Sequence, residues 1–249
     1  DLVESDRWNS FDHFNRTTEK IVQGYESSGA WVEVESIQTG GQLGSGRWII
    51  REATDVRSAT VDIVSPVTER ILDYKKNPWN VIQWSGGTSA QGIRADLIII
   101  DDINEFKCLA PGSLRGKVVL TRLSPRSLLG VLAGSGAVGV ISDQSVPNLT
   151  DAVAWTKFGW GSIPLSQAGS ALVGFAVSEN DGKRLREKLR KYKKIDLLLR
   201  ADINRSVGHH DVVSGIVRGA DDPQDEVWAI AHSNEPGAAD NASGVALTL

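Results

Sequence analysis

The stretch SLLGVLAGSGAVGVISDQ, residues 127–144, constrains the fold most, because it passes from a helical pattern to a strand pattern with no linker between them. Its first part is rich in small residues, which allow a helix to pack closely on its neighbours, and its second part is the apolar run VGVIS. A short apolar run followed by polar residues is typical of a buried strand. The stretch therefore predicts a compact α/β or β-rich module.

Patterns in other parts of the chain add further elements. The segment 15–31 has the periodicity of an amphipathic helix with Gly29 past its end, and the alternation in WVEVESIQ predicts a strand over 31–38. The strand pattern GFAVS is followed by a basic helix, with Ser178 or Asn180 as the candidate cap. Leucines form the apolar stripe of that helix, so its lysines and arginines are interpreted as a solvated face rather than a binding patch.

Residues 212–231 have the pattern of two strands joined by the polar turn ADDPQDE. The second of these strands, VWAIAHS at 227–233, is nearly all apolar, as expected for a central strand that is covered on both faces. His232 would then lie at the carboxyl end of a strand, where open α/β sheets bind ligands. A helix is expected to follow, with Asn241 or Ser243 as its cap.

Composition narrows the class of protein. The net charge is −4, with no acidic or basic tail, so neither nucleic acid nor a membrane surface is an expected partner. No apolar stretch approaches the roughly 18 residues of a membrane span, and the single Cys108 allows no internal disulfide. The sequence contains no methionine, so its start is expected to have been removed, and a secreted or periplasmic location is favoured over a cytoplasmic one.

His232 and Asp240 are the residues of the last segment that indicate chemistry. Imidazole nitrogen and carboxylate oxygen both bind zinc, and these two residues flank one loop, from which both could reach one point. The small residues at 237–239 leave room for backbone and metal to approach closely. On spacing alone, a hydrogen-bonded structural histidine at the strand end remains the alternative.

The neighbouring histidines His209 and His210, with Asp211, are a second candidate cluster. Such a group also invites a metal hypothesis, but it precedes a strand pattern. It is interpreted as a solvent-exposed loop that leads into the sheet.

The segment AHSNEPGAADNASGVA resembles the first metal-binding motif of the co-catalytic zinc aminopeptidases, the family of bacterial leucyl aminopeptidases and glutamate carboxypeptidase-like enzymes. Its most specific part is the string Asp-Asn-Ala-Ser-Gly. GSLRGKVVLTR, AGSGAVGVISD and IPLSQAGSALVGFAVSENDGKRLREKL resemble the protease-associated domain that many of these enzymes carry as an insertion. The resemblance covers about residues 5–249.

This resemblance implies an α/β fold, the N-terminal part of a three-layer αβα zinc-peptidase domain interrupted by a β-rich protease-associated domain. Residues 1–65 would supply a helix and strands of the peptidase domain, and residues 66–177 the insertion. Residues 178–249 would return into the peptidase domain, which is incomplete at its C-terminus.

The resemblance also implies roles for single residues. His232 would bind one zinc ion and Asp240 would bridge two, and a cis peptide is expected between Asp240 and Asn241. Many members have an aspartate two residues after the histidine, where it orients the imidazole through a hydrogen bond. Asn234 stands there in this chain. It can accept the same hydrogen bond but adds no charge, and Glu235 is the candidate to replace the missing carboxylate.

The remaining catalytic parts of the family, including the general-base glutamate and a second histidine, follow this motif and are expected beyond Leu249. The full-length protein is therefore expected to be a metallopeptidase, a two-zinc aminopeptidase acting on peptide or amino-acid amide substrates, and this chain alone to be inactive. The alternative is a non-catalytic, peptidase-like binding protein, which Asn234 favours and His232 and Asp240 oppose. Apolar surface near 211–249 is expected to need a partner, either the remainder of the peptidase domain or a second copy in a homo-oligomer.

Overall fold

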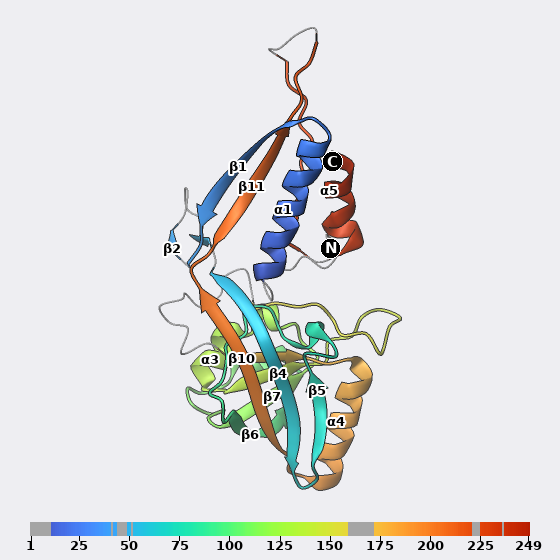
Figure 1. Cartoon of the computed structure of the whole chain (residues 1–249). Coiled ribbons are helices and arrows are strands. Elements are labelled where there is room, and N and C mark those ends of the chain that lie inside the picture. Colours follow the sequence, from blue (N-terminus) through green and yellow to red (C-terminus); the bar gives the residue numbers. More distant parts are fainter. Residues whose placement is uncertain are drawn as a thin grey trace. The chain divides into compact units, whose positions relative to one another are not determined.

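The structure is a computed structural model that describes residues 11–40, 42–43, 49–50, 52–158, 172–220, 225–235 and 237–249. The chain forms two compact units (Figure 1). Unit 1 combines Asp1–Asp55 with Arg205–Leu249, and unit 2 is Val56–Asn204. Within the ranges given above, no helix has the length and apolar character needed to cross a membrane.

Unit 2 is built on a mixed seven-stranded sheet with the order β5-β4-β10-β6-β7-β8-β9. β6, β7, β8 and β9 are parallel, whereas β5 pairs with β4, and β10 with β6, in antiparallel fashion. The strands are β4 (Ala53–Ser65), β5 (Glu69–Asp73), β6 (Ile93–Ile99), β7 (Lys117–Thr121), β8 (Gly139–Ser142), β9 (Val173–Ala176) and β10 (Asp196–Ser206). The helices are α2 (Ile103–Lys107), α3 (Leu129–Ser135) and α4 (Glu179–Tyr192), with short 3-10 turns at Pro78–Asn80 and Pro125–Ser127.

Both faces of this sheet are covered. Val119 of β7 packs in one core cluster with Leu132 of α3, while the next residue, Leu120, packs in the other with Leu185 of α4. Successive side chains of a strand point to opposite faces, so the central strands are buried on both sides. This arrangement is typical of an α/β sheet and confirms the predicted fold class.

The stretch 127–144 forms as predicted, with α3 leading into β8, and Ser178 caps α4 by accepting from the backbone N–H of Asp181. The compact unit is nevertheless wider than the segment 66–177 that was predicted as an insertion. Pro66, the sequence-based boundary, lies in the turn of the hairpin that joins β4 to β5. The unit also contains α4 and most of β4 and β10, and its borders are Val56 in β4 and Asn204 in β10.

Arg186 of α4 ties the helix to the ends of two strands. Its guanidinium donates to both carboxylate oxygens of Asp143, just after β8, at 2.8 Å each. It also donates to both oxygens of Asp101, after β6, at 2.5 and 3.0 Å. Burial lowers the pKa of Arg186, but the hydrogen bonds that it donates to the two carboxylates, and their negative charges, raise it by more, so the side chain stays charged.

Gly182 makes room for this network, because a Cβ there would overlap the carboxylate of Asp143. Gly182→Ala is therefore expected to lower the free energy of unfolding of unit 2 by about 1–3 kcal/mol. Gly134→Ala in α3 is the matched control, since open space surrounds that position, and it should raise stability by up to about 1 kcal/mol. Urea unfolding followed by tryptophan fluorescence measures both. Equal effects of the two substitutions would contradict the assigned role of Gly182.

Asp101 gives the network a pH dependence. Burial acts to raise the pKa of its carboxyl, but hydrogen bonds from Arg186 and from the backbone N–H of Arg122 lower it overall. A carboxylate with a lowered folded pKa contributes stability that is present above the unfolded pKa of about 4 and is lost as the pH falls through the folded value. Asp101→Asn should therefore lose less thermal stability than the wild type between about pH 5 and about pH 2. Parallel melting curves of the two proteins over this range would be the contrary result.

Unit 1 contains a helix packed on a two-stranded antiparallel sheet. The ring of Tyr25 in α1 lies directly on Gly215 of β11, and Leu249 packs on Gly24. Trp31 of β1 is opposite Ile216. The elements are α1 (Phe11–Ser27), β1 (Trp31–Gln38), β2 (Gln42–Leu43), β3 (Ile49–Ile50), β11 (His209–Ile216) and α5 (Ser243–Thr248). β1 matches its predicted range. The helix predicted from Asn15 begins four residues earlier, at Phe11, and ends at Ser27, before Gly29 as predicted.

The strand predicted over 227–233 is not formed, so that prediction is wrong. Val227, Trp228 and Ile230 are 102%, 75% and 85% exposed, and no strand of the described ranges pairs with them. A segment that is apolar on both faces needs neighbours on both sides to hold it as a strand. His232 therefore lies in an irregular segment and not at a strand end.

Candidate metal centre

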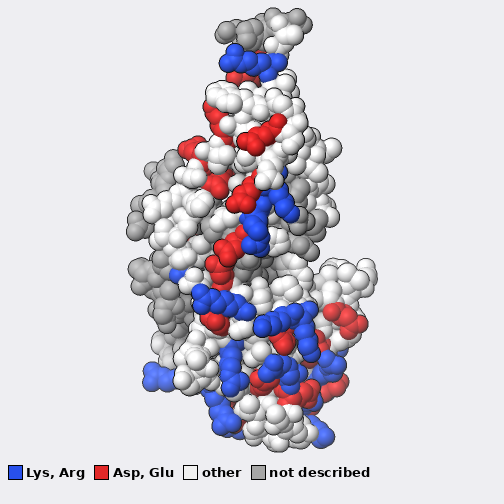
Figure 2. All heavy atoms as spheres, viewed as in Figure 1, with Lys and Arg blue, Asp and Glu red and all other residues white. Residues whose placement is uncertain are grey.

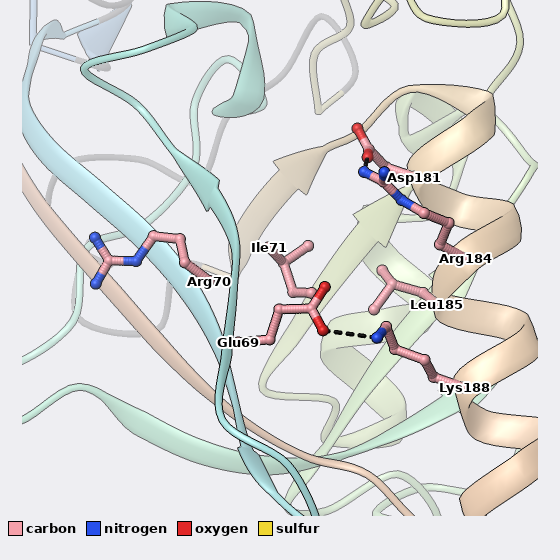
Figure 3. A pocket seen from close by; sticks show the side chains of 7 residues that line it. All are labelled: Glu69, Arg70, Ile71, Asp181, Arg184, Leu185 and Lys188. Carbon is pink, nitrogen blue, oxygen red and sulfur yellow. Dashed lines mark hydrogen bonds and ion pairs between the residues drawn. The ribbon is translucent and has the colours of Figure 1, made fainter.

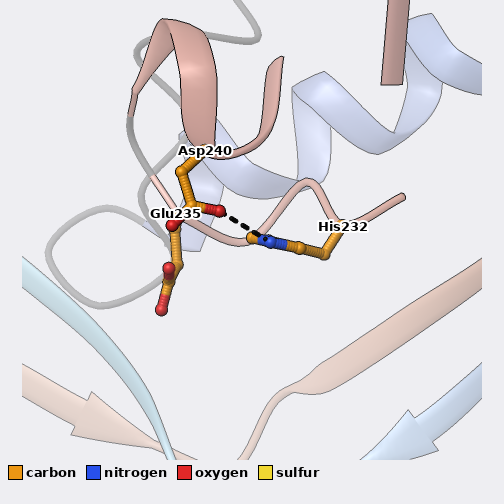
Figure 4. Close-up of side chains that lie close together, drawn as sticks. All are labelled: His232, Glu235 and Asp240. Atoms are coloured by element: carbon orange, nitrogen blue, oxygen red, sulfur yellow. Dashed lines mark ion pairs between the residues drawn. The ribbon is translucent and has the colours of Figure 1, made fainter. Parts of the chain in front are cut away.

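The candidate site is one loop that leads into α5. Ala238–Ala242 form a wide helical turn that continues directly as the helix. Within this turn the backbones of Asp240 and Asn241 leave the helical conformation, and the peptide bond between them is cis, as the resemblance implied. The turn thus directs the side chain of Asp240 back towards His232 (Figure 4).

The two predicted metal ligands meet in this loop. Nε2 of His232 lies 3.0 Å from Oδ1 of Asp240. The two side chains are 45% and 78% exposed, so both are accessible from solvent. Two ligands of one tetrahedral zinc ion, each about 2.0–2.1 Å from the metal, are about 3.3 Å apart. The observed spacing is therefore close to that of two donors to a single ion.

A third donor, Glu235, lies with this pair. Each of His232, Glu235 and Asp240 offers one ligand atom, and the three atoms lie within 4.8 Å of one another (Figure 4). Sequence reasoning named Glu235 only as a replacement for the carboxylate missing at Asn234. Its place in the same loop, between His232 and Asp240, is the signal that could have marked it as a donor in its own right.

Asn241 holds the backbone of the loop. Its side-chain oxygen accepts a hydrogen bond from the backbone N–H of His232 at 3.3 Å. It does not cap α5, and neither does Ser243, so the predicted side-chain cap of this helix is absent. None of the hydrogen bonds found among the described residues joins Asn234 to the imidazole, so the orienting role of Asn234 stays a prediction.

The other histidine cluster is part of a strand. His209 and His210 are the first residues of β11, so the interpretation as a loop is corrected: their backbones pair with Gln38 and Ile37 of β1. The ring of His210 meets the ring of Phe14 edge-on, with centroids 6.1 Å apart. This contact gives His210 a packing role.

A pocket lies between β5 and α4 (Figure 3). Its charged groups are paired: Lys188 donates to Glu69 at 2.6 Å, Arg184 pairs with Asp181, and Arg70 turns away to Asp62. Figure 2 shows positive and negative side chains interspersed over this unit. Lys183, Arg184 and Lys188 of α4 are therefore solvent-accessible and paired with carboxylates, as the sequence indicated. Arg186 is the exception, because its side chain is buried against Asp143 and Asp101.

No protein-family model and no curated protein sequence matches the chain. Solved structures do. A peptidase M28 precursor from Shewanella amazonensis SB2B has a TM-score of 0.59 and 18% identity, over 88% of this chain and 48% of its own. An aminopeptidase from Aneurinibacillus sp. strain AM-1 has a TM-score of 0.57 and 20% identity, over 99% and 54%. BSAP, a zinc aminopeptidase from Bacillus subtilis, has a TM-score of 0.65 and 15% identity, over 97% and 52%.

The chain has the fold of these structures over the matched part. At identities of 15% to 20% the likeness establishes the fold alone. The chain spans about half the length of each of them.

Proposed function

We propose that this chain supplies the first part of the catalytic centre of a metal-dependent aminopeptidase. The observation that carries the proposal is the approach of His232 and Asp240 to 3.0 Å on a single loop, in a chain with the fold of known peptidases. His232 would bind one zinc ion and Asp240 would bridge two. The neighbours named aminopeptidase or zinc aminopeptidase support this proposal, and so does the motif in which both residues lie.

The residues present fit such a metal. Imidazole nitrogen and carboxylate oxygen are the donors that zinc takes in catalytic sites, and both side chains are exposed enough to receive an ion and a substrate. Bound zinc polarises a carbonyl oxygen and makes a bound water acidic, which is the chemistry that peptide hydrolysis requires. The chain's own part is to hold the donors: Asn241 fixes the backbone at His232, and the loop returns Asp240 to the imidazole.

The proposal extends to the whole polypeptide in which these residues occur. The general-base glutamate is not assigned to any residue up to Leu249, so this chain alone should hydrolyse little substrate. Unit 2 would be the protease-associated domain, which is supported by its place between two segments of unit 1 and by the segments that resemble that domain.

Hydrolysis of an amino-acid anilide tests this function. The complete polypeptide should release aniline product from a substrate with a free amino group and not from its N-acetylated form. A chelator should remove the activity, and added Zn²⁺ should restore it. Metal binding at His232 and Asp240 without any hydrolysis would instead favour the non-catalytic binding protein, for which the neutral Asn234 is the supporting observation.

Gly244 gives a test that leaves all donors in place. A Cβ on this residue would overlap the side-chain amide of Asn241, which holds the backbone of His232. Gly244→Ala is therefore expected to weaken Zn²⁺ binding by about 10- to 100-fold, as loss of a supporting group around a metal does. Gly219→Ala, where a Cβ meets nothing within 4 Å, is the control and should bind normally. Competition titration with a zinc-binding dye measures the Zn²⁺ affinity of both variants. Equal affinities would contradict a role of Asn241 in supporting the metal site.

A further inference from the structure

We propose that Glu235 is a direct metal ligand, so that one loop of this chain holds a divalent ion through three of its own side chains. The inference rests on the proposed function and adds a donor to the same site. Its basis is that the ligand atoms of His232, Glu235 and Asp240 lie within 4.8 Å of one another. Donors to one tetrahedral ion at about 2.0–2.2 Å are about 3.3–3.6 Å apart, so the donors have to approach one another by no more than about 1.5 Å.

The charge of the loop supports this role. Asp240 alone brings one negative charge, and Asn234 brings none. With Glu235 as a ligand, the donor set is one neutral imidazole and two carboxylates, which together balance a divalent cation. A His₂Glu or similar mixed set with an open position is the usual composition of a catalytic zinc site, and carboxylates also accept harder ions such as Mn²⁺.

Glu235 lies on the same loop as the other two donors. The residue lies between His232 and Asp240 in the loop, and its side chain is half-buried, whereas those of the other two are exposed. Asn241 fixes the backbone at the start of the loop through the N–H of His232. The three donors therefore come from one short segment of the chain.

Two substitutions show whether Glu235 binds the metal directly or acts only through its negative charge. Glu235→Gln should weaken Zn²⁺ binding by more than about 100-fold, because it removes a metal donor and not merely a supporting group. Asp225→Asn removes the same charge from an exposed site in the preceding segment and should change the affinity by less than about twofold. An affinity of E235Q equal to that of the wild type would overturn the proposal, as would equal losses in both variants.

Glu235→His distinguishes a direct ligand from a residue that only positions His232, because its effect on metal binding should depend on which metal is used. Imidazole is a good ligand for Zn²⁺ and a poor one for Mn²⁺, so E235H should recover Zn²⁺ binding to within about tenfold of wild type while Mn²⁺ binding stays as weak as in E235Q. A carboxylate that acted only by charge or by orienting His232 would not be replaced in this metal-selective way. E235H that binds Zn²⁺ no better than E235Q would contradict direct ligation.

The outcomes also distinguish this inference from the proposed function. If His232→Ala and Asp240→Asn abolish Zn²⁺ binding but both Glu235 variants bind as the wild type does, the metal site stands and only the role of Glu235 fails. If the His232→Ala and Asp240→Asn variants bind Zn²⁺ normally, the proposed function itself is contradicted, and the inference about Glu235 with it. Far-UV circular dichroism of each variant verifies that the fold is retained.

Discussion

Arg186→Ala is expected to lower the free energy of unfolding of unit 2 by about 3–5 kcal/mol. The side chain of Asp143 is 1% exposed, and Arg186 donates to both of its oxygens, so the substitution leaves a buried carboxylate without its counter-charge. Asp101 loses its two hydrogen bonds from the guanidinium at the same time. Urea unfolding at neutral pH measures the loss.

Lys183→Ala is the control for this effect. Lys183 pairs with Glu179 on the same helix, but both side chains are partly exposed, so its loss should change stability by less than about 1 kcal/mol. A combined Arg186→Met and Asp143→Asn variant should recover part of the stability, because no buried charge remains unpaired. If R186A and K183A were equally stable, the buried ion pair would have no special role.

His232→Ala and Asp240→Asn are each expected to weaken Zn²⁺ binding by more than about 100-fold, because each removes a metal donor and not merely a supporting group. Both side chains are largely exposed, so the stability of the metal-free protein should change by less than about 0.5 kcal/mol. Activity of the complete polypeptide should fall with the metal.

His209→Ala is the matched control for that pair of variants. His209 also lies next to a carboxylate, 3.5 Å from Asp211, but in strand β11 and outside the proposed site. Its loss should leave Zn²⁺ affinity and stoichiometry unchanged. Equal losses in H209A and H232A would show that Zn²⁺ binds to surface histidines without selectivity.

The fold class could be predicted from the sequence where local patterns carry enough information. The small-residue helix before β8, the alternation in β1 and the cap at Ser178 are all set by neighbouring residues in the chain. The apolar pattern at 227–233 leads to a wrong prediction, because such a segment forms a strand only when segments distant in sequence pair with it and cover it. A proline in a hairpin turn has the same local signal as a linker, so Pro66 does not mark the border of the compact unit, which begins at Val56.

The candidate site was predictable in its types of residue and less so in its geometry. His232 and Asp240 were found because the residues around Asp240 form a specific motif. The hydrogen bond from the His232 backbone to Asn241, and the approach of Glu235, depend on how the wide turn at Ala238–Ala242 folds back. A linear pattern does not encode that path, so the sequence indicates Glu235 only as a replacement for the carboxylate missing at Asn234.

Anomalous diffraction at the zinc edge from crystals grown with Zn²⁺ tests the central claim most directly. The account predicts a strong peak about 2.0–2.2 Å from an imidazole nitrogen of His232 and from a carboxylate oxygen of Asp240. A map in which zinc lies elsewhere, while both side chains are ordered and bind no ion, would contradict it.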